Sequence, residues 1–230
     1  MSRVVVVTGG TKGIGRAVAD RFRAAGDHVQ AIGRDRCDVT DEQQVGAFFA
    51  ELGPVDVLVN NAGMGASAPL ERTALRDWRA HLDVNATGAF LCTRAVLPGM
   101  RERDSGRIVT VASTAGRAGG RYTAAYAASK HAAVGLMRAV AAEVAGSGVT
   151  ANAVCPAFVR TDLARRAVDR IVETTGRDQA QAEAALAATS PLGRLLEPDE
   201  VAFAVAFLAA PEAAAINGQA LVLDGGGLQK

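Results

Sequence analysis

The chain has little cysteine, almost no net charge and no long apolar run, and each of these absences excludes a class of protein. Its three cysteines, Cys37, Cys92 and Cys155, are an odd number without ligand spacing, so we expect neither a disulfide framework nor a metal site, and a reducing compartment. The 25 basic and 24 acidic side chains form no Lys/Arg block, which argues against nucleic acid or a membrane surface as partner. Apolar runs are too short for a signal peptide or a membrane span. We therefore expect a cytoplasmic protein that binds small molecules.

Apolar residues make up 49% of the chain, and they recur in β-branched runs of strand length. Alanine-rich helical stretches separate these runs, which span residues 4–7, 29–32, 55–59, 108–111, 149–154 and 220–223. Such alternation predicts a parallel sheet of about six to seven strands with helices on both faces. The fold class is thus α/β, a single Rossmann-type doubly wound domain over residues 1–230, with ligands at the carboxyl ends of its strands.

Two helical stretches, residues 86–103 and 123–145, are longer than one sheet face needs. Their surplus apolar stripe predicts packing against another subunit, as a dimer or a homotetramer. The segment of about residues 159–196 is helical in pattern, charged and without a strand. Because it follows a strand's carboxyl end, we interpret it as a mobile lid over the substrate entrance.

A glycine-rich loop follows the first strand and opens the first helix at residues 8–15. Gly9 permits a sharp turn, Gly13 lets the backbone approach a pyrophosphate, and Gly15 allows close packing of helix and strand. This context predicts a dinucleotide site, to which we also assign Thr11, Lys12 and Ile14.

The end of the second strand distinguishes the two nicotinamide dinucleotides. An acidic residue there binds the ribose hydroxyls of NAD, whereas a basic one pairs with the 2′-phosphate of NADP. Here Gly33 is followed by Arg34, with Lys12 in the loop, so NADP(H) is favoured. Asp35 keeps NAD(H) possible. We assign Asp38 to the adenine amino group, and Asp41 to the cap of the next helix.

Tyr126 and Lys130 lie one helical turn apart, and Ser113 lies upstream of them. Residues four apart project from the same face of a helix. A phenol with a pKa of about 10 exchanges a proton poorly at neutral pH until a nearby cation stabilises the phenolate. The set predicts proton transfer at a carbonyl or an alcohol.

Taken in order, these residues resemble the short-chain dehydrogenase/reductase family from end to end. The resemblance rests on the glycine loop, Asn60 to Gly63 after a strand, Asn85 to Gly88 at the start of a long helix, Ser113, Tyr126 with Lys130, Ile216 to Gln219, and Asp224 to Gly226. It is similar in particular to the 3-oxoacyl and polyketide ketoreductases, and it implies an NAD(P)-dependent oxidoreductase acting on CH–OH and C=O groups.

The resemblance also implies roles. Tyr126 would be the general acid or base, Ser113 would polarise the substrate oxygen, and Lys130 would bind the nicotinamide ribose and lower the pKa of Tyr126. Asn85 would anchor a water that continues the proton relay. Hydride transfer needs no metal. Further cofactor contacts are expected at Val39, Asn61, Ala62, Gly63, Tyr126, Pro156, Val159 and Thr161.

Two features depart from the family pattern. After the second strand, the usual helix and much of a third strand are missing, which leaves the adenosine pocket around Arg34 partly open. Ala157 follows Pro156 where the family commonly has glycine, and its methyl group is small enough that we expect binding to survive.

The expected substrate pocket is mostly apolar and includes Met64, Ala115, Tyr122, Ala157, Phe158 and lid residues. This suits reduction of an acyl or aromatic ketone. The side chains of Arg160, Arg165 and Arg166 could bind a phosphopantetheine group or the surface of an acyl carrier, or they could simply be solvated. Two alternatives stay open: an NAD-dependent dehydrogenase of a cyclic or secondary alcohol, and a non-catalytic dinucleotide-binding regulator.

Overall fold

The computed structural model describes residues 2–228 and contains one sheet of six parallel strands. The strands are β1 (Val4–Thr8), β2 (His28–Ile32), β3 (Val57–Asn60), β4 (Gly106–Val111), β5 (Val149–Pro156) and β6 (Ala220–Leu223). Their order across the sheet is β2-β1-β3-β4-β5-β6, and every neighbouring pair runs parallel. The predicted doubly wound α/β class is therefore confirmed, with six strands.

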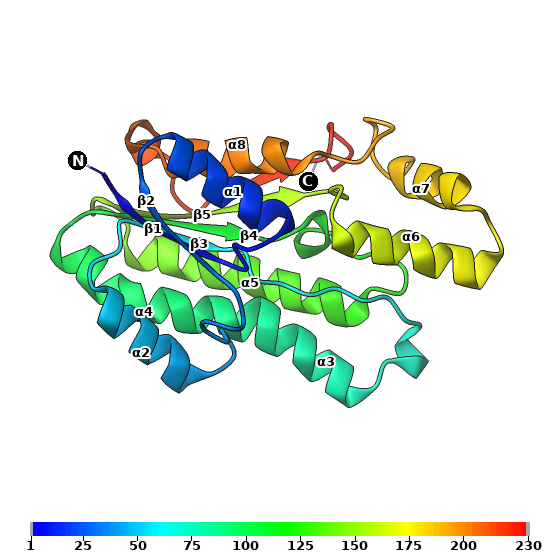
Figure 1. Cartoon of the computed structure of the whole chain (residues 1–230), viewed down its shortest axis with the longest axis horizontal. Helices are drawn as coiled ribbons and strands as arrows, with labels where there is room; N and C mark the ends of the chain where they lie inside the picture. The colour runs from blue at the N-terminus through cyan, green and yellow to red at the C-terminus, as the bar shows by residue number, and fades with distance from the viewer. Residues whose placement is uncertain (1, 229–230) are drawn as a thin grey trace.

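Helices cover both faces of the sheet (Figure 1). On one face lie α1 (Gly13–Ala24) and α8 (Pro198–Leu208), and on the other lie α2 (Glu42–Leu52), α4 (Gly88–Glu102) and α5 (Ala124–Glu143). Successive strand residues point to opposite faces. Val5 and Val7 therefore pack in the core under α1 and α8, while Val6 packs in the core under α2, α4 and α5. Within residues 2–228, no helix combines the length and hydropathy of a membrane span.

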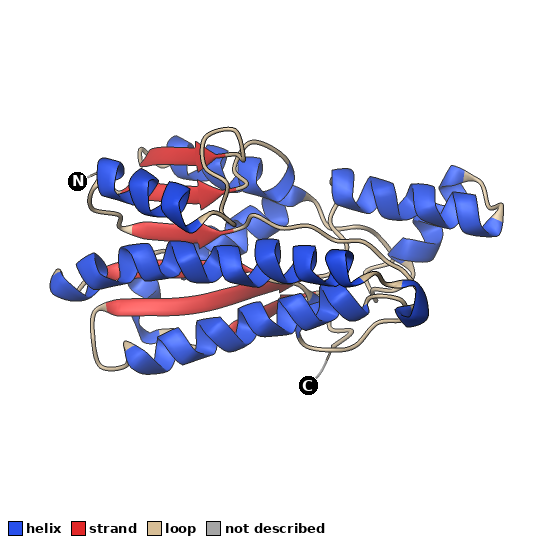
Figure 2. Cartoon of the chain, turned by 90° about the horizontal axis from the view of Figure 1, so that it is seen from below, coloured by secondary structure: helices blue, strands red, loops and turns tan. Residues whose placement is uncertain are grey.

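The long helix on the second face starts earlier than the sequence predicted. α3 (Leu75–Leu82) continues through a π-helical turn (Asp83–Thr87) into α4, so Asn85 lies inside a helix and does not begin one. The expectation that Asn85 to Gly88 opens the helix is wrong, because no Gly or Pro interrupts residues 75–87 and the π turn absorbs the extra residue. Figure 2 shows this side of the molecule.

The connection from β2 to α2 is short, as the sequence predicted. Residues 33–41 form neither helix nor strand, and β2 is an edge of the sheet. Cys37 and Val39 nevertheless enter the core. Asp41 caps α2 by accepting hydrogen bonds from the Gln43 and Gln44 amides, which confirms that assignment. Short 3-10 helices span Leu70–Arg72, Thr114–Gly116 and Pro211–Ala215.

The predicted lid forms a helical hairpin, α6 (Asp162–Thr175) and α7 (Gln179–Ala187), that projects beyond the carboxyl edge of the sheet (Figures 1 and 2). It has a small apolar cluster of its own, with Val168, Ala182, Leu186 and Leu195 at its centre. Its two stems meet where Val159 pairs with Leu196 in a parallel bridge. The lid is therefore an appended unit closed by a narrow neck.

Candidate active site

The carboxyl ends of β1, β3, β4 and β5 lie at one edge of the sheet, where parallel strands present their loops. Ser113 follows β4 by two residues, and its neighbours in space come from α5. A side-chain hydrogen bond joins Ser113 and the Tyr126 phenol. Sequence-distant residues predicted to act together are thus in contact.

Tyr126 and Lys130 share one face of α5, as predicted. The Lys130 side chain is only 5% exposed, and its Nζ donates to the Val111 carbonyl oxygen at 3.0 Å. The same Nζ lies 6.0 Å from the centroid of the Tyr126 ring. The α5 helix therefore places a half-buried phenol beside a buried amine.

Burial dominates the electrostatics of this pair. It raises the pKa of the Tyr126 phenol, and the hydrogen bond with Ser113 acts in the opposite direction. Burial also lowers the pKa of Lys130 to about 8, because an ammonium out of water is disfavoured. In this structure, burial outweighs any influence of Lys130 on the phenol, so the expectation that Lys130 lowers the pKa of Tyr126 stays a prediction.

Cys155 lies beside these groups at the end of β5. Its sulfur is hydrogen bonded to the Ser113 backbone, and burial raises the pKa of its thiol. All three cysteines are free and buried. The thiol thus lies next to the backbone of Ser113.

Asn85 joins the loop after β3 to α5. Its Oδ1 accepts from the Met64 amide at 2.9 Å, and its Nδ2 donates to the Met64 carbonyl and to the Ser129 hydroxyl, both at 2.9 Å. The π turn aims this side chain away from its own helix, a common use of such turns at functional sites. Its predicted water-binding role is untested, while its side chain tethers the loop.

Sequence reasoning missed His81, which is 2% exposed and lies one helical turn before Asn85. Its Nε2 accepts from the Ala66 amide at 3.1 Å, and its ring meets the Tyr126 ring edge-on, with centroids 6.4 Å apart. The spacing of four residues from Asn85 was the available signal.

The glycine loop is fixed by Asn61, whose Nδ2 donates to the carbonyls of Thr8 at 2.9 Å and Gly9 at 3.1 Å. The Thr8 hydroxyl in turn accepts from the amides of Asn61 and Ala62. Asn61 therefore holds the loop through its side chain, and Gly9 lies against Ala62 so closely that a side chain there would collide with backbone.

The amino end of α1 fits a dinucleotide phosphate. Lys12 precedes it without a side-chain cap, and its first turn carries no acidic residue, so the amides remain available to an anion. Gly13 has φ +53° and faces the Thr161 methyl group, which leaves backbone rather than side chains at the surface. Thr11 lies against Gly33, at the side where the adenosine would extend.

The adenosine side departs from the simplest prediction. Arg34 is 77% exposed, and its Nε lies 3.5 Å from Asp38 Oδ2. Asp38 also accepts from the Thr40 amide and hydroxyl, and these bonds, more than Arg34, lower the pKa of its carboxyl. The two residues assigned to the phosphate and the adenine are thus ion-paired, while the Val39 side chain packs toward Gly88.

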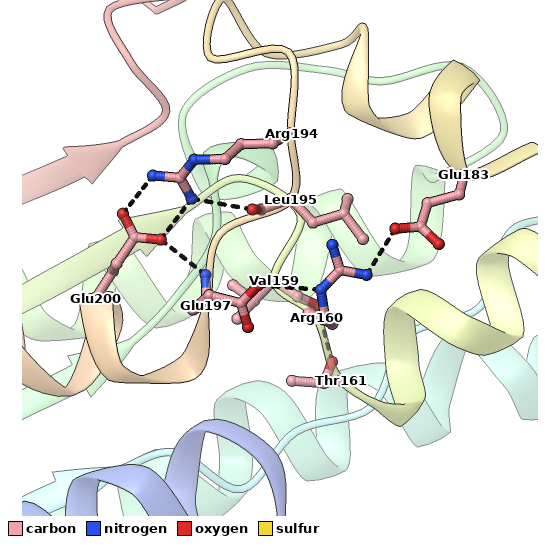
Figure 3. Close-up of polar contacts among 8 residues, drawn as sticks. All are labelled: Val159, Arg160, Thr161, Glu183, Arg194, Leu195, Glu197 and Glu200. Atoms are coloured by element: carbon pink, nitrogen blue, oxygen red, sulfur yellow. Dashed lines mark hydrogen bonds and ion pairs between the residues drawn. The ribbon is translucent and has the colours of Figure 1, made fainter. Parts of the chain in front are cut away.

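Ion pairs hold the neck of the lid together (Figure 3). Arg160 donates to Glu183 on α7 at 2.6 Å and to Glu197 on the other stem at 3.0 Å. Arg194 makes a two-pronged contact with Glu200, at 2.7 and 2.8 Å. Arg165 pairs with Asp162 on its own helix. Two of the three arginines proposed to meet a carrier are therefore already ion-paired.

The remaining predicted residues lie around this edge. Pro156 ends β5, and Val159 is buried at the neck, where it pairs with Leu196. Thr161 begins α6 and faces Gly13. Tyr122 and Phe158 are exposed, and Tyr122 has φ +64°, a strained value for an aromatic residue.

Comparison with known proteins agrees with this arrangement. The family model described as enoyl-(acyl carrier protein) reductase matches residues 33–227. The chain belongs to the short-chain dehydrogenase/reductase family. It is an NAD(P)-dependent oxidoreductase acting on CH–OH and C=O groups.

Three similar proteins illustrate the range of this family. The acetoacetyl-CoA reductase of Shinella zoogloeoides is 36% identical over 98% of each chain. A variant actinorhodin polyketide ketoreductase with NADPH superposes with a TM-score of 0.91 and 36% identity, covering 100% of this chain and 98% of that one. The Thermoplasma acidophilum aldohexose dehydrogenase gives a TM-score of 0.89 and 36% identity, covering 98% and 93%.

Proposed function

We propose that the enzyme reduces a ketone, of the 3-oxoacyl or polyketide-like kind, to a secondary alcohol with NADP(H). The observation that carries this proposal is the contact of Ser113 with the Tyr126 phenol beside buried Lys130. Similarity to an acetoacetyl-CoA reductase and to a ketoreductase with NADPH supports the substrate class and the cofactor.

In this proposal, Tyr126 donates its proton to the carbonyl oxygen while Ser113 donates a hydrogen bond to the same oxygen. When bound, the nicotinamide supplies the hydride. The hydrogen bond with Ser113 lowers the pKa of Tyr126 against the rise that burial causes, which makes the phenol a better proton donor than burial alone would allow. Lys130 holds the nicotinamide ribose, and Asn85 anchors a water that returns the proton.

Arg34 and Lys12 would hold the 2′-phosphate of NADP(H). For this, Arg34 has to exchange its contact with Asp38 for the phosphate, which an exposed pair at 3.5 Å permits at little cost. Phosphate carries more charge than one carboxylate and accepts a planar guanidinium in two-pronged geometry.

The assembly we propose is a cytoplasmic homotetramer of single-domain subunits spanning residues 1–230. Its support is the exposed aromatic side chains of Phe90 on α4 and of Phe203 and Phe207 on α8. Each lies on the outer side of a helix whose inner side already packs on the sheet.

Initial rates with NADPH and NADH against a panel of ketones test the function. Arg34→Ala is expected to weaken NADPH far more than NADH, because only NADP carries the 2′-phosphate. Arg36→Ala is the matched control, since its guanidinium bonds Gln30 and lies over the Phe48 ring. Equal losses for both cofactors in Arg34→Ala would remove the cofactor assignment.

An NAD-dependent alcohol dehydrogenase is the second candidate. It is favoured by the shortened connection after β2 and by similarity to an aldohexose dehydrogenase. Faster turnover of NAD with an alcohol than of NADPH with any ketone would decide for it. The hypothesis of a non-catalytic regulator is not kept, because the chain is a member of an oxidoreductase family.

A further inference from the structure

His81 is buried, and both of its ring nitrogens are hydrogen bonded to the backbone. Its Nδ1 lies 2.7 Å from the Asp77 carbonyl oxygen, and its Nε2 accepts from the Ala66 amide at 3.1 Å. Since Nε2 accepts, the ring proton must lie on Nδ1 and be donated to Asp77. The contact within α3 therefore fixes the tautomer, and the contact with Ala66 joins α3 to the loop after β3.

The loop between residues 62 and 68 is anchored at three points. Asn85 holds the Met64 amide and carbonyl, His81 holds the Ala66 amide, and the Tyr122 carbonyl accepts from the Ala68 amide at 2.8 Å. His81 and Asn85 lie one turn apart on the same helix, so they grip the loop side by side.

This loop lies directly against the phenol ring. Gly65 approaches so closely that a Cβ there would be 3.2 Å from Tyr126 Cε2 and 3.3 Å from Leu163 Cδ1 on the lid. The His81 ring also meets the Tyr126 ring edge-on, at 74°. The loop thus fills the space between the proton donor and the first turn of the lid.

We propose that His81 is a positioning residue for the reduction, one that fixes the Tyr126 ring both directly and through the Met64–Ala66 segment of the loop. The inference rests on the proposed function. A shift of about 1 Å at a reacting group costs up to 100-fold in rate, so an aromatic ring held from two sides contributes to kcat rather than to cofactor binding.

Two substitutions test the proposal. His81→Leu removes both hydrogen bonds and leaves the Ala66 amide without a partner, and it is expected to lower kcat by about tenfold or more with KM for NADPH within about twofold. His81→Gln keeps one acceptor and one donor and is expected to restore most of the loss. Amide hydrogen exchange over residues 64–68 should rise in His81→Leu and stay low in His81→Gln.

Asn217→Leu is the matched control. Asn217 accepts from the Ala151 amide at 2.9 Å and donates to the Ala141 carbonyl at 2.8 Å, so it makes the same kind of bridge away from the phenol. It is expected to lower Tm while leaving kcat per folded molecule unchanged. An unchanged kcat in His81→Leu, or an equal loss in Asn217→Leu, overturns the proposal.

Failure of the proposed function would look different. If the wild-type enzyme turns over no ketone, the proposed function is contradicted. Amide exchange over residues 64–68 then still tests whether His81 holds the loop. Unchanged exchange over residues 64–68 in His81→Leu would contradict its role in holding the loop.

Discussion

The candidate active site around Ser113, Tyr126 and Lys130, called the corner below, lies at the same edge of the sheet as the lid (residues 159–196). The two parts are held by different forces. In the corner, Lys130, Asn85 and His81 are buried, and each is bonded to a backbone group of another element. The lid has a small core of its own, and exposed ion pairs of Arg160 tie it to its neck. Removing one partner of a buried hydrogen bond costs about 1 to 3 kcal/mol of folding stability, whereas an exposed ion pair contributes about 0 to 1 kcal/mol.

In the proposed function, this difference separates two tasks. Proton transfer needs fixed geometry, which the sheet, α5 and the β3 loop would supply. Substrate entry and choice need a part that moves or changes at little cost, which an appended hairpin with a narrow neck would supply.

The strongest test of the rigid corner is Tyr126→Phe. Because it deletes only the hydroxyl, NADPH binding should persist while kcat falls by about 100-fold to 10,000-fold, the usual worth of a general acid. Steady-state rates and cofactor fluorescence titration measure the two effects. Near-native rates where chemistry is limiting would show that another group donates the proton.

The burial of Lys130 predicts a pH-dependent stability. Its pKa is about 8 in the folded state against an ordinary value of 10.5 for lysine, so between these pH values the unfolded chain binds more protons and the free energy of unfolding rises with pH. Urea unfolding at a series of pH values gives the free energy of unfolding of the wild type and of Lys130→Met. The wild-type value minus the variant value should rise by about 2 kcal/mol between about pH 7.5 and 9.5.

The comparison with Lys130→Met is needed because the buried thiols change the pH dependence of stability in the opposite direction. Burial raises the pKa values of Cys37, Cys92 and Cys155, so the folded state keeps their protons longer and stability falls as pH rises through that range. Both proteins share these groups. A flat difference curve would mean that Lys130 is more hydrated than its burial indicates.

A matched pair of valines tests whether the lid is a separate unit. Val109→Ala, in β4 at the centre of the sheet, should lower the global free energy of unfolding by about 2 kcal/mol. Val168→Ala, in the lid cluster, should leave the main urea transition nearly unchanged and speed amide exchange over residues 162–187. Equal losses in the main transition would show that lid and body unfold together.

The smallest expected effect concerns the neck. Arg160→Ala should change KM for the ketone by about threefold and leave the chemical step unaffected, since it releases α7 from the stems without touching the corner. Arg170→Ala, which removes an exposed pair with Glu173 on α6 alone, serves as control. A drop in kcat with KM unchanged would place Arg160 in the chemistry instead.

Much of the fold and the site was readable from the sequence because the signals are local. Apolar runs marked all six strands within a few residues, the glycine loop marked the turn from β1 into α1, and the spacing of Tyr126 and Lys130 placed both on one face of α5. The start of the helix before Asn85 was misplaced, since a π turn leaves no Gly or Pro signal.

The sequence by itself determined the sheet, its helical layers and which side chains we propose to react, because strand and helix periodicity and short motifs are written in neighbouring residues. Only the tertiary structure decided that His81 reaches Ala66, that Cys155 meets the Ser113 backbone, and that Arg34 pairs with Asp38. Such contacts depend on how loops from separate strands meet at one edge, and burial there sets the pKa of Lys130.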